Sequence, residues 1–404
     1  MINNNHLRAS NIGAKTVLIL AHLYFVVAII INLLPFFDND NSLMDFGSFY
    51  ASGLKAQNGE NPYDPNSEYI FDINFSQVGA GGKMMNLNPP ISVVAFRVLS
   101  YFDPNRSLII WQVMSAILYA STVIMLGWYY KQNITPTKII WAFTLAGFWH
   151  TLVLGQIYIL LLLFAALGWI FLQKGKYIQA GIAIGLVVAI KPNFVIWPIF
   201  LLASGYYVTF FAVAVSGLIV SAIPIFFYGT KIYSQWLEAS TLRLETLIMP
   251  GNNSIVGLTA RFQNMNIGII LSVIIVATLL IFSKWKTSDN MESSERISAL
   301  GILASLLASP ISWTGYTILL LPIFISLKKW TLPVTISAAL LSIPFAIVLQ
   351  LFQTSFVNFV LFGWLYGWAI LLLLGSLFGF SGNKNHDDEN HPDELIHLKQ
   401  ETIS

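Results

Sequence analysis

A few residues able to do chemistry stand beside long apolar runs in this chain. Asp45 follows the first apolar run within MDFGSFYASG, and Lys191 stands inside AIGLVVAIKPNFVIWPIFLL. Arg261 comes about two helical turns after a Gly-Asn-Asn-Ser sequence at residues 251–254. A carboxylate can take a proton from an attacking hydroxyl group, and cations can stabilise a phosphate leaving group. These residue types point to the transfer of a group away from a phosphate.

Asp45 stands near the start of a predicted short interfacial helix that Gly59 ends. The spacing of the residues after it is roughly helical at Tyr50, Ala51, Leu54 and Ala56. Besides the role of base, Asp45 could simply cap the helix, because Asp is favoured at that position. Further on, ENPYDPN has the composition of a turn, and Asp64 is predicted to belong to it.

Lys191 is predicted to lie where one helix ends and Pro192 begins the next. A lysine within the membrane is costly unless it faces water or an anion. It could be a lysine whose head group reaches the interface from a helix end. The alternative is a cation held for a phosphate or a carboxylate.

Polar and aromatic residues also mark other breaks between apolar runs. Gly155 permits a tight turn between His150 and Gln156. Gln156 at the start of a span is expected to face a cavity or a partner helix. Trp313 and Tyr316 follow a break at Ser309–Pro310, although aromatic residues there could form an interfacial belt.

The elements that must position these residues are membrane helices. The chain has 404 residues, of which 56% are hydrophobic and 10% charged, whereas soluble domains carry roughly 25% charged residues. Its apolar runs approach the roughly 20 residues needed to cross a bilayer. We predict an all-α polytopic membrane protein of about twelve transmembrane helices with external interfacial or re-entrant helices. The predicted spans are 16–37, 107–130, 138–154, 156–173, 177–190, 192–203, 207–228, 266–283, 297–308, 314–327, 331–350 and 356–380.

The basic residues of the short connections predict cytoplasmic termini. With that orientation, one side receives Arg8, Lys15, Lys131, Lys138, Lys174, Lys176, Lys284, Lys286, Arg296, Lys328 and Lys329. The opposite side receives the first external loop, 38–106, and a second large loop, 229–265. Interfacial elements are expected at 86–104 and 231–249, and all the candidate residues gather on this face. Residues 1–380 form one membrane domain in this interpretation, and 381–404 form a disordered cytoplasmic tail.

Composition excludes several other functions. The net charge of +2 gives no reason to expect nucleic-acid binding. Without cysteine there are no disulfides or thiolate metal sites, and no histidines stand at zinc-site spacing. No cofactor is expected, although a divalent metal is not excluded.

One face thus combines a carboxylate, two cations, amides and aromatic residues, which suits an anionic, sugar-bearing lipid. A phosphate leaving group is already a weak base, so no second carboxylic acid is needed. A single base with direct displacement would invert the anomeric centre, in contrast to the paired carboxylates of most glycosidases.

The ordered motifs MDFGSFYASG…NGENPYDP, NPPISVVAF, GQIYILLLLFAALG, AGIAIGLVVAIKPNFVIWPIFLL, GNNSIVGLTARF and SPISWTGYTILLLP resemble glycosyltransferase family 87 over residues 12–380. This family comprises polyprenol-phosphate-mannose-dependent mannosyltransferases of the C-type membrane superfamily. The resemblance implies a non-cytoplasmic active site with Asp45 as base. It matches Lys191 to the Lys-Pro after a Gly-rich helix, and the Asn-x-Ser…Arg motif to Asn252, Ser254 and Arg261.

The sequence therefore predicts an inverting transferase of the bacterial inner membrane. It would move a hexose, by family default mannose, from a polyprenyl-phosphate-sugar donor to a glycan or glycolipid acceptor. Asp45 is the expected base, and Lys191 and Arg261 the expected phosphate contacts. The expected substrate contacts are Tyr50, His150, Gln156, Asn252, Asn253, Ser254, Ser312, Trp313 and Tyr316. The alternatives are a lipid-linked-sugar flippase, which usually has inverted repeats, and a glycan ligase or polymerase.

Overall fold

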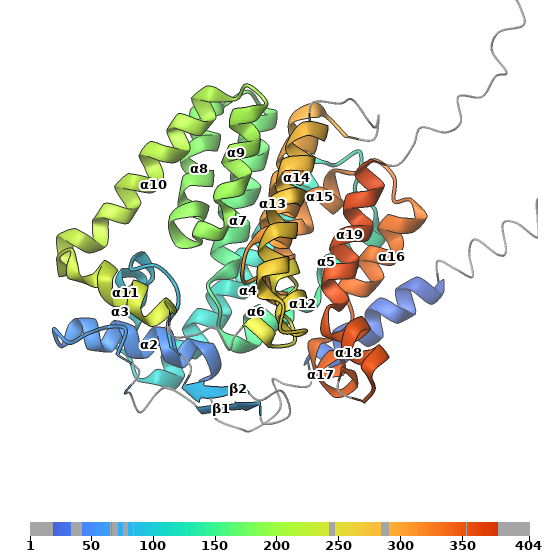
Figure 1. Cartoon of the computed structure of the whole chain (residues 1–404). Coiled ribbons are helices and arrows are strands. Elements are labelled where there is room, and N and C mark those ends of the chain that lie inside the picture. Colours follow the sequence, from blue (N-terminus) through green and yellow to red (C-terminus); the bar gives the residue numbers. More distant parts are fainter. Residues whose placement is uncertain are drawn as a thin grey trace, which may run out of the picture.

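The structure is a computed structural model that describes residues 19–33, 43–64, 66, 72–75, 80–83, 85–241, 247–283, 291–352 and 354–378. Long helices run side by side, and short elements gather at one end of them (Figure 1). Some predictions fall outside the described residues. They concern the tail 381–404 and the cations Arg8, Lys15, Lys284 and Lys286.

Four helices in the described part of the chain are long and apolar enough to cross a membrane. They are α4 (Pro104–Tyr129), the continuous pair α5 (Pro136–Ala142) and α6 (Ala146–Leu154), α10 (Tyr207–Tyr228) and α13 (Met265–Phe282). The number rises to six if α16 (Leu332–Leu341) with α17 (Phe345–Leu351), and α18 (Phe356–Gly363) with α19 (Leu365–Leu377), each count as one span. The chain is therefore a polytopic membrane protein, as predicted.

The other apolar helices are shorter. They are Ile19–Leu33, α7 (Tyr158–Gln173), α8 (Tyr177–Ile190), the 3-10 helix Pro192–Val195 with α9 (Ile196–Ala203), and the 3-10 helix Thr314–Leu320 with α15 (Leu321–Ser326). At 1.5 Å per residue, such helices fall short of a hydrocarbon core of roughly 30 Å. The count of about twelve spans therefore stays a prediction. Helix α14 (Ser293–Ala308) is buried along almost its whole length and packs against α9 at the centre of the bundle.

Two predicted spans are not continuous helices. The span predicted at 331–350 bends by 84° between α16 and α17, and the one at 356–380 bends by 56° between α18 and α19. Pro344 precedes α17 and cannot continue α16, because proline lacks a backbone donor and clashes with the preceding turn. At the second break, Trp364 leaves the helical conformation with φ −127°. The sequence analysis placed one apolar run at each of these positions and did not predict the bends.

Helix starts follow local capping chemistry. The Asp103 side chain accepts a hydrogen bond from the backbone N–H of Arg106 at 3.0 Å, and Pro104 occupies the first position of α4. The Ser254 hydroxyl likewise accepts from the backbone N–H of Gly257 at 2.9 Å and begins α12 (Ile255–Ala260). These starts are encoded by a few adjacent residues.

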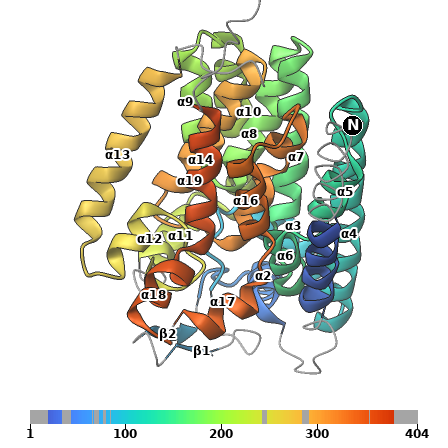
Figure 2. The same cartoon turned by 90° about the vertical axis from the view of Figure 1, so that its right-hand side faces the viewer.

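The elements that form the two large predicted loops lie together at the lower end of Figure 1. They are α2 (Met44–Gln57), β1 (Asp72–Phe75), β2 (Ala80–Lys83), α3 (Ile91–Leu99), α11 (Lys231–Thr241) and α12. Figure 2 shows α2, α12 and the hairpin at the same end from the side, beside α17 and α18. The short helices expected near Asp45, within 86–104 and within 231–249 are thus present. The antiparallel hairpin, which pairs Asp72 with Lys83, departs from the all-α expectation.

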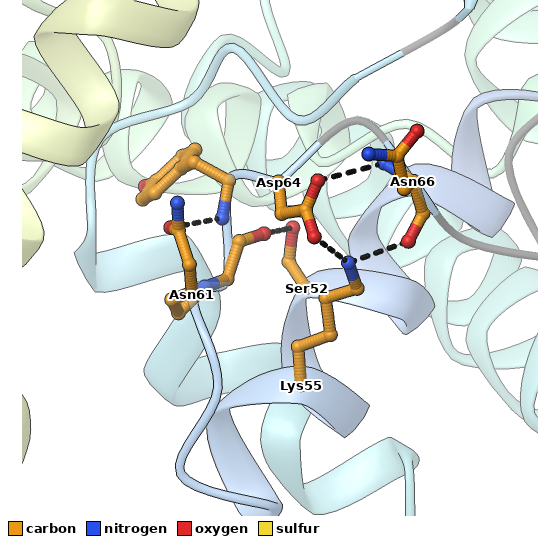
Figure 3. Close-up of polar contacts among 7 residues, drawn as sticks. Ser52, Lys55, Asn61, Asp64 and Asn66 are labelled. Atoms are coloured by element: carbon orange, nitrogen blue, oxygen red, sulfur yellow. Dashed lines mark hydrogen bonds and ion pairs between the residues drawn. The ribbon is translucent and has the colours of Figure 1, made fainter.

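Helix α2 is fastened to the turn that follows it (Figure 3). The Lys55 ammonium lies 2.8 Å from Asp64 Oδ2 and donates to the Asn66 carbonyl at 2.6 Å, and the Ser52 hydroxyl donates to the Pro62 carbonyl at 2.8 Å. Asp64 Oδ1 also accepts from the backbone N–H of Asn66. Asp64 is therefore a turn residue, as predicted, and it helps to hold the helix that carries Asp45.

Candidate active site

Asp45 lies buried in the first turn of α2, with 6% of its surface exposed. The Gln156 amide donates a hydrogen bond to Asp45 Oδ2. The alternative role of helix cap is wrong, because Leu43 occupies the capping position and no side chain caps α2. The carboxyl group is thus directed into the protein and meets a residue 111 positions away in the sequence.

The turn that presents Gln156 requires glycine at position 155. Gly155 ends α6 in the left-handed conformation with φ +66°, which glycine adopts without steric cost. A Cβ atom at Gly155 would lie 2.7 Å from Phe46 Cβ, so α2 packs directly on this turn. The same contact that brings α2 close also places Asp45 within reach of Gln156.

Gly155→Ala should separate α2 from the turn and lower both stability and transfer activity. Steric strain of this kind costs about 1–3 kcal/mol, which thermal unfolding of the purified protein would detect. Gly175→Ala is the matched control, because Gly175 has φ +67° and an added Cβ would meet nothing within 4 Å. Equal effects of the two variants would show that only backbone strain matters and that α2 does not depend on this contact.

Lys191 stands at the end of α8 in an extended conformation, and Pro192 opens the next 3-10 helix, as predicted. Its ammonium nitrogen lies 5.3 Å from the ring centre of Tyr158 and 5.5 Å from that of Tyr316. Both distances are within the range of cation–π attraction. The two rings meet edge to face at 4.5 Å. Tyr158 opens α7, so three separate segments converge on this cation.

Burial raises the pKa of Asp45 to about 7, although the Gln156 hydrogen bond and the positive charge of Lys191 both lower it. Asp45 and Lys191 therefore belong to one electrostatic site. A carboxyl group that titrates near neutral pH is suited to general-base chemistry, since it accepts a proton readily and releases it again.

The activity of such a base depends on pH in a defined direction. If Asp45 must be ionised, kcat/KM should rise about tenfold per pH unit below its pKa and level off above pH of about 7. Lys191→Met removes a positive charge that lowers this pKa, so it should move the midpoint to higher pH. Initial rates between pH 5 and 9 test both statements. A midpoint near the ordinary value for aspartate would exclude a buried base at this position.

A second group of predicted residues joins two loops at the same end. The Asn253 backbone N–H donates to the Ser312 carbonyl at 2.7 Å, and the Ser312 N–H donates to Asn252 Oδ1 at 2.9 Å. The side chains of Asn252 and Ser254 both donate to the Pro310 carbonyl. These bonds pair the Gly-Asn-Asn-Ser loop with the break after α14, directly before Trp313. Asn252 and Ser254 thus act in the architecture of the loops.

Besides Nη1 of Arg261, four buried polar atoms around these loops and the Gly155 turn lack a hydrogen-bond partner among the described residues. They are His150 Nδ1, Gln156 Oε1, Asn253 Oδ1 and Ser312 Oγ. Buried polar groups are usually satisfied, so unpartnered ones call for an explanation such as an absent ligand or water. The His150 ring packs edge to face on Phe345 at 4.8 Å, and Phe345 contacts Gly251 of the same loop.

Arg261 is used mainly to hold its own loop. Its Nε donates to the Ile248 carbonyl at 3.1 Å, and one terminal nitrogen donates to the carbonyls of Met249 and Asn252 at 2.7 and 2.9 Å. The other terminal nitrogen, Nη1, has no partner in the described structure. Burial lowers the pKa of Arg261 to about 10. No described hydrogen bond or ion pair links Arg261 to Lys191.

The family model of glycosyltransferase family 87 matches residues 86–310. The chain belongs to glycosyltransferase family 87. The resemblance drawn from the sequence is thereby confirmed, and the family makes this membrane protein a glycosyltransferase. Gln156, Lys191 and Arg261 lie inside the matched region, whereas Asp45 precedes it. Comparison with curated proteins and with solved structures gave no match.

Sequence reasoning missed one member of this candidate site. Tyr158 contacts Lys191, yet it reads in the sequence as an ordinary aromatic residue at the start of a span. Tyr50, by contrast, was predicted as a substrate contact, and its hydroxyl donates to the Phe102 carbonyl at 2.8 Å. Among the described residues, no three His, Asp or Glu side chains gather as metal ligands would.

Proposed function

We propose that this family 87 glycosyltransferase moves a hexose, with mannose the first sugar to test, from a polyprenyl-phosphate-sugar donor to a glycan or glycolipid acceptor. The observation that supports this most directly is that the positive charge of a buried lysine, Lys191, acts on the buried carboxyl group of Asp45 and lowers its pKa, without an ion pair between the two. A base and an anion-binding cation in one site are what sugar transfer from a lipid phosphate requires.

The proposed reaction is a single displacement. Asp45 as carboxylate takes the proton of an acceptor hydroxyl, and the hydroxyl oxygen forms a bond to the anomeric carbon. The bond from that carbon to the phosphate oxygen breaks, its electron pair stays on the phosphate, and polyprenyl phosphate leaves. Lys191 stabilises the charge that develops on the phosphate. Because attack and departure occur on opposite faces of the sugar, the anomeric configuration is inverted.

The other predicted residues receive roles that their geometry supports. Gln156 orients Asp45 through its amide N–H, while its unpartnered carbonyl is available to a sugar hydroxyl. Unpartnered atoms of His150, Asn253 and Ser312 suit the same task. Arg261 offers only Nη1 to a phosphate. Tyr50, Asn252, Ser254, Trp313 and Tyr316 complete the proposed substrate site, with Asn252 and Ser254 acting through the loop that they hold.

We place the enzyme in a bacterial inner membrane, with cytoplasmic termini and the site on the periplasmic or extracellular face. The gathering of α2, α3, α11 and α12 at one end of the bundle supports a site on one face (Figure 1). A flippase needs polar groups near the middle of the membrane, whereas the proposed orientation puts Asp45 and its partners at one face.

The test is transfer of radiolabelled mannose from polyprenyl-phosphate-mannose in proteoliposomes that contain the purified protein and a membrane glycolipid extract. Labelled glycolipid is the expected product, and its linkage should have the configuration opposite to that of the donor. Label that only becomes accessible on the other leaflet would indicate a flippase. A ladder of longer products would indicate a polymerase. If no mannose is transferred but another hexose is, the reaction class stands and only the proposed identity of the sugar is wrong.

A further inference from the structure

Lys191 is a buried cation whose ammonium group has no oxygen acceptor among the described contacts. Its exposed fraction is 9%, and no described hydrogen bond or ion pair reaches its ammonium group. Buried charges are normally paired or hydrogen-bonded, because removing them from water is costly. The carboxyl group of Asp45 interacts with it electrostatically but forms no ion pair with it in the described structure.

Three other cations, the buried Lys55 and Lys138 and the half-buried Arg261, are held differently. The Lys55 ammonium binds the Asp64 carboxylate and the Asn66 carbonyl. The Lys138 ammonium donates to the carbonyls of Ile325 and Leu327. The Arg261 guanidinium donates to three carbonyls, as described above. These three side chains donate hydrogen bonds to the protein itself, whereas the Lys191 ammonium and the buried Arg296 side chain donate none in the described structure. Only Lys191 of these two has aromatic rings at cation–π distance among the described contacts.

Two aromatic rings, rather than oxygen acceptors, surround the Lys191 ammonium group. The rings of Tyr158 and Tyr316 lie at 5.3 and 5.5 Å from the ammonium, and each side chain is 2% exposed. Their positions are fixed by close packing. A Cβ atom at Gly315 would lie 2.4 Å from the Tyr158 ring, and Phe194 packs edge to face on Tyr316 at 5.7 Å.

We propose that Tyr158 and Tyr316 are positioning residues that hold the Lys191 ammonium by their ring faces, so that its N–H donors remain available to a phosphate. A carboxylate in their place would fix the lysine equally well but would neutralise its charge. Aromatic faces attract the cation without satisfying its donors. The inference rests on the proposed function in taking lipid-linked phosphate as the anion.

The proposal makes the electrostatics of the rings measurable. In a series at position 158, phenylalanine and its mono-, di- and trifluoro derivatives keep the ring while fluorine progressively weakens its attraction for a cation. We expect affinity for polyprenyl monophosphate in detergent micelles to fall stepwise, by about fivefold to thirtyfold over the series, as expected for one desolvated cation–π contact. The donor kcat/KM should fall in parallel, with the acceptor KM unchanged.

Two comparisons separate this role from simple packing. Tyr158→Leu should match or exceed the loss seen with trifluorophenylalanine, and Tyr158→Phe should restore most of the affinity. The same fluorinated residues at Phe194 are the matched control. Phe194 is equally buried and touches Tyr316, and its backbone N–H donates to the Lys191 carbonyl at 3.1 Å, yet no described contact joins its ring to the Lys191 ammonium. If affinity for polyprenyl monophosphate falls with fluorination at both positions 158 and 194, or at neither, the proposal is wrong.

The design also distinguishes this inference from the proposed function. Wild-type protein that binds polyprenyl monophosphate with the expected ring dependence, but transfers no sugar, would refute the transferase mechanism and leave the aromatic support standing. Transfer by the wild type with a flat fluorination series would refute the aromatic support alone. Inorganic phosphate as a second probe tells whether the phosphate group by itself is recognised. No binding of either probe would refute an anion site at Lys191.

Discussion

Asp45→Asn should lower the rate of sugar transfer by about 10²–10⁴-fold, the usual contribution of a general base. The asparagine side chain is nearly the same size and can still accept the Gln156 hydrogen bond through its carbonyl oxygen. It cannot take the proton of an acceptor hydroxyl. The loss should therefore appear in kcat, with little change in the binding of the donor.

The variant should fold at least as well as the wild type. Burial raises the pKa of Asp45 from an ordinary value near 4 to about 7, which means that the ionised side chain destabilises the folded state. This penalty is complete above pH of about 7 and disappears as the pH falls toward 4. Thermal unfolding should accordingly favour the asparagine variant at pH 8 and show no difference at pH 4.

The matched control is Asp64→Asn, which removes a carboxylate from the same loop. The Asp64 side chain is 38% exposed and pairs with Lys55, and that contact holds its pKa below the ordinary value. The buried Lys55 keeps its hydrogen bond to the Asn66 carbonyl and asparagine can still accept from it, so the variant should be less stable but transfer sugar near the wild-type rate. If Asp45→Asn transfers sugar at a rate near that of the wild type, Asp45 is not the base, whatever the activity of Asp64→Asn.

Lys191→Met should weaken use of the donor by about 10–150-fold in kcat/KM. Hydrogen bonds to charged groups contribute roughly 1.5–3 kcal/mol, and each 1.4 kcal/mol is a factor of ten. Methionine has similar length and should pack between the Tyr158 and Tyr316 rings. Because no described hydrogen bond to Lys191 is lost, stability should not fall, and steady-state kinetics against donor concentration will show the defect.

Lys231→Met serves as the control for charge. Lys231 begins α11 at the same end of the molecule and is exposed, so its loss should change donor kcat/KM by no more than about twofold. An equal defect in both variants would mean that the overall positive charge of this face attracts the donor. An unaffected Lys191→Met enzyme would mean that the phosphate is bound elsewhere.

Several local features were predictable because adjacent residues encode them. Pro192 cannot continue α8, since proline lacks a backbone donor, so the break after Lys191 follows from two neighbouring residues. The turn at Gly155 and the turn around Asp64 are likewise encoded by adjacent residues. The short helix after Asp45 and the apolar elements also follow from the spacing of apolar residues, which is a property of short segments.

The bends and the hairpin were harder to predict. The pairs α16–α17 and α18–α19 read as single apolar runs, and apolar composition cannot show whether two halves share an axis. Their directions depend on what each half packs against. The hairpin lies in a stretch whose composition indicates only a loop.

In the candidate site, too, some features follow from the sequence and others only from the tertiary structure. The sequence by itself determined which residue types were available: a carboxylate at 45, cations at 191 and 261, amides at helix breaks, and a membrane chain to carry them. Only the tertiary structure decided their uses. It joined Asp45 to Gln156, placed Lys191 between Tyr158 and Tyr316, and turned Arg261 toward backbone carbonyls. The physical reason is that such contacts join segments far apart in the chain, and helix packing rather than local propensity sets those distances.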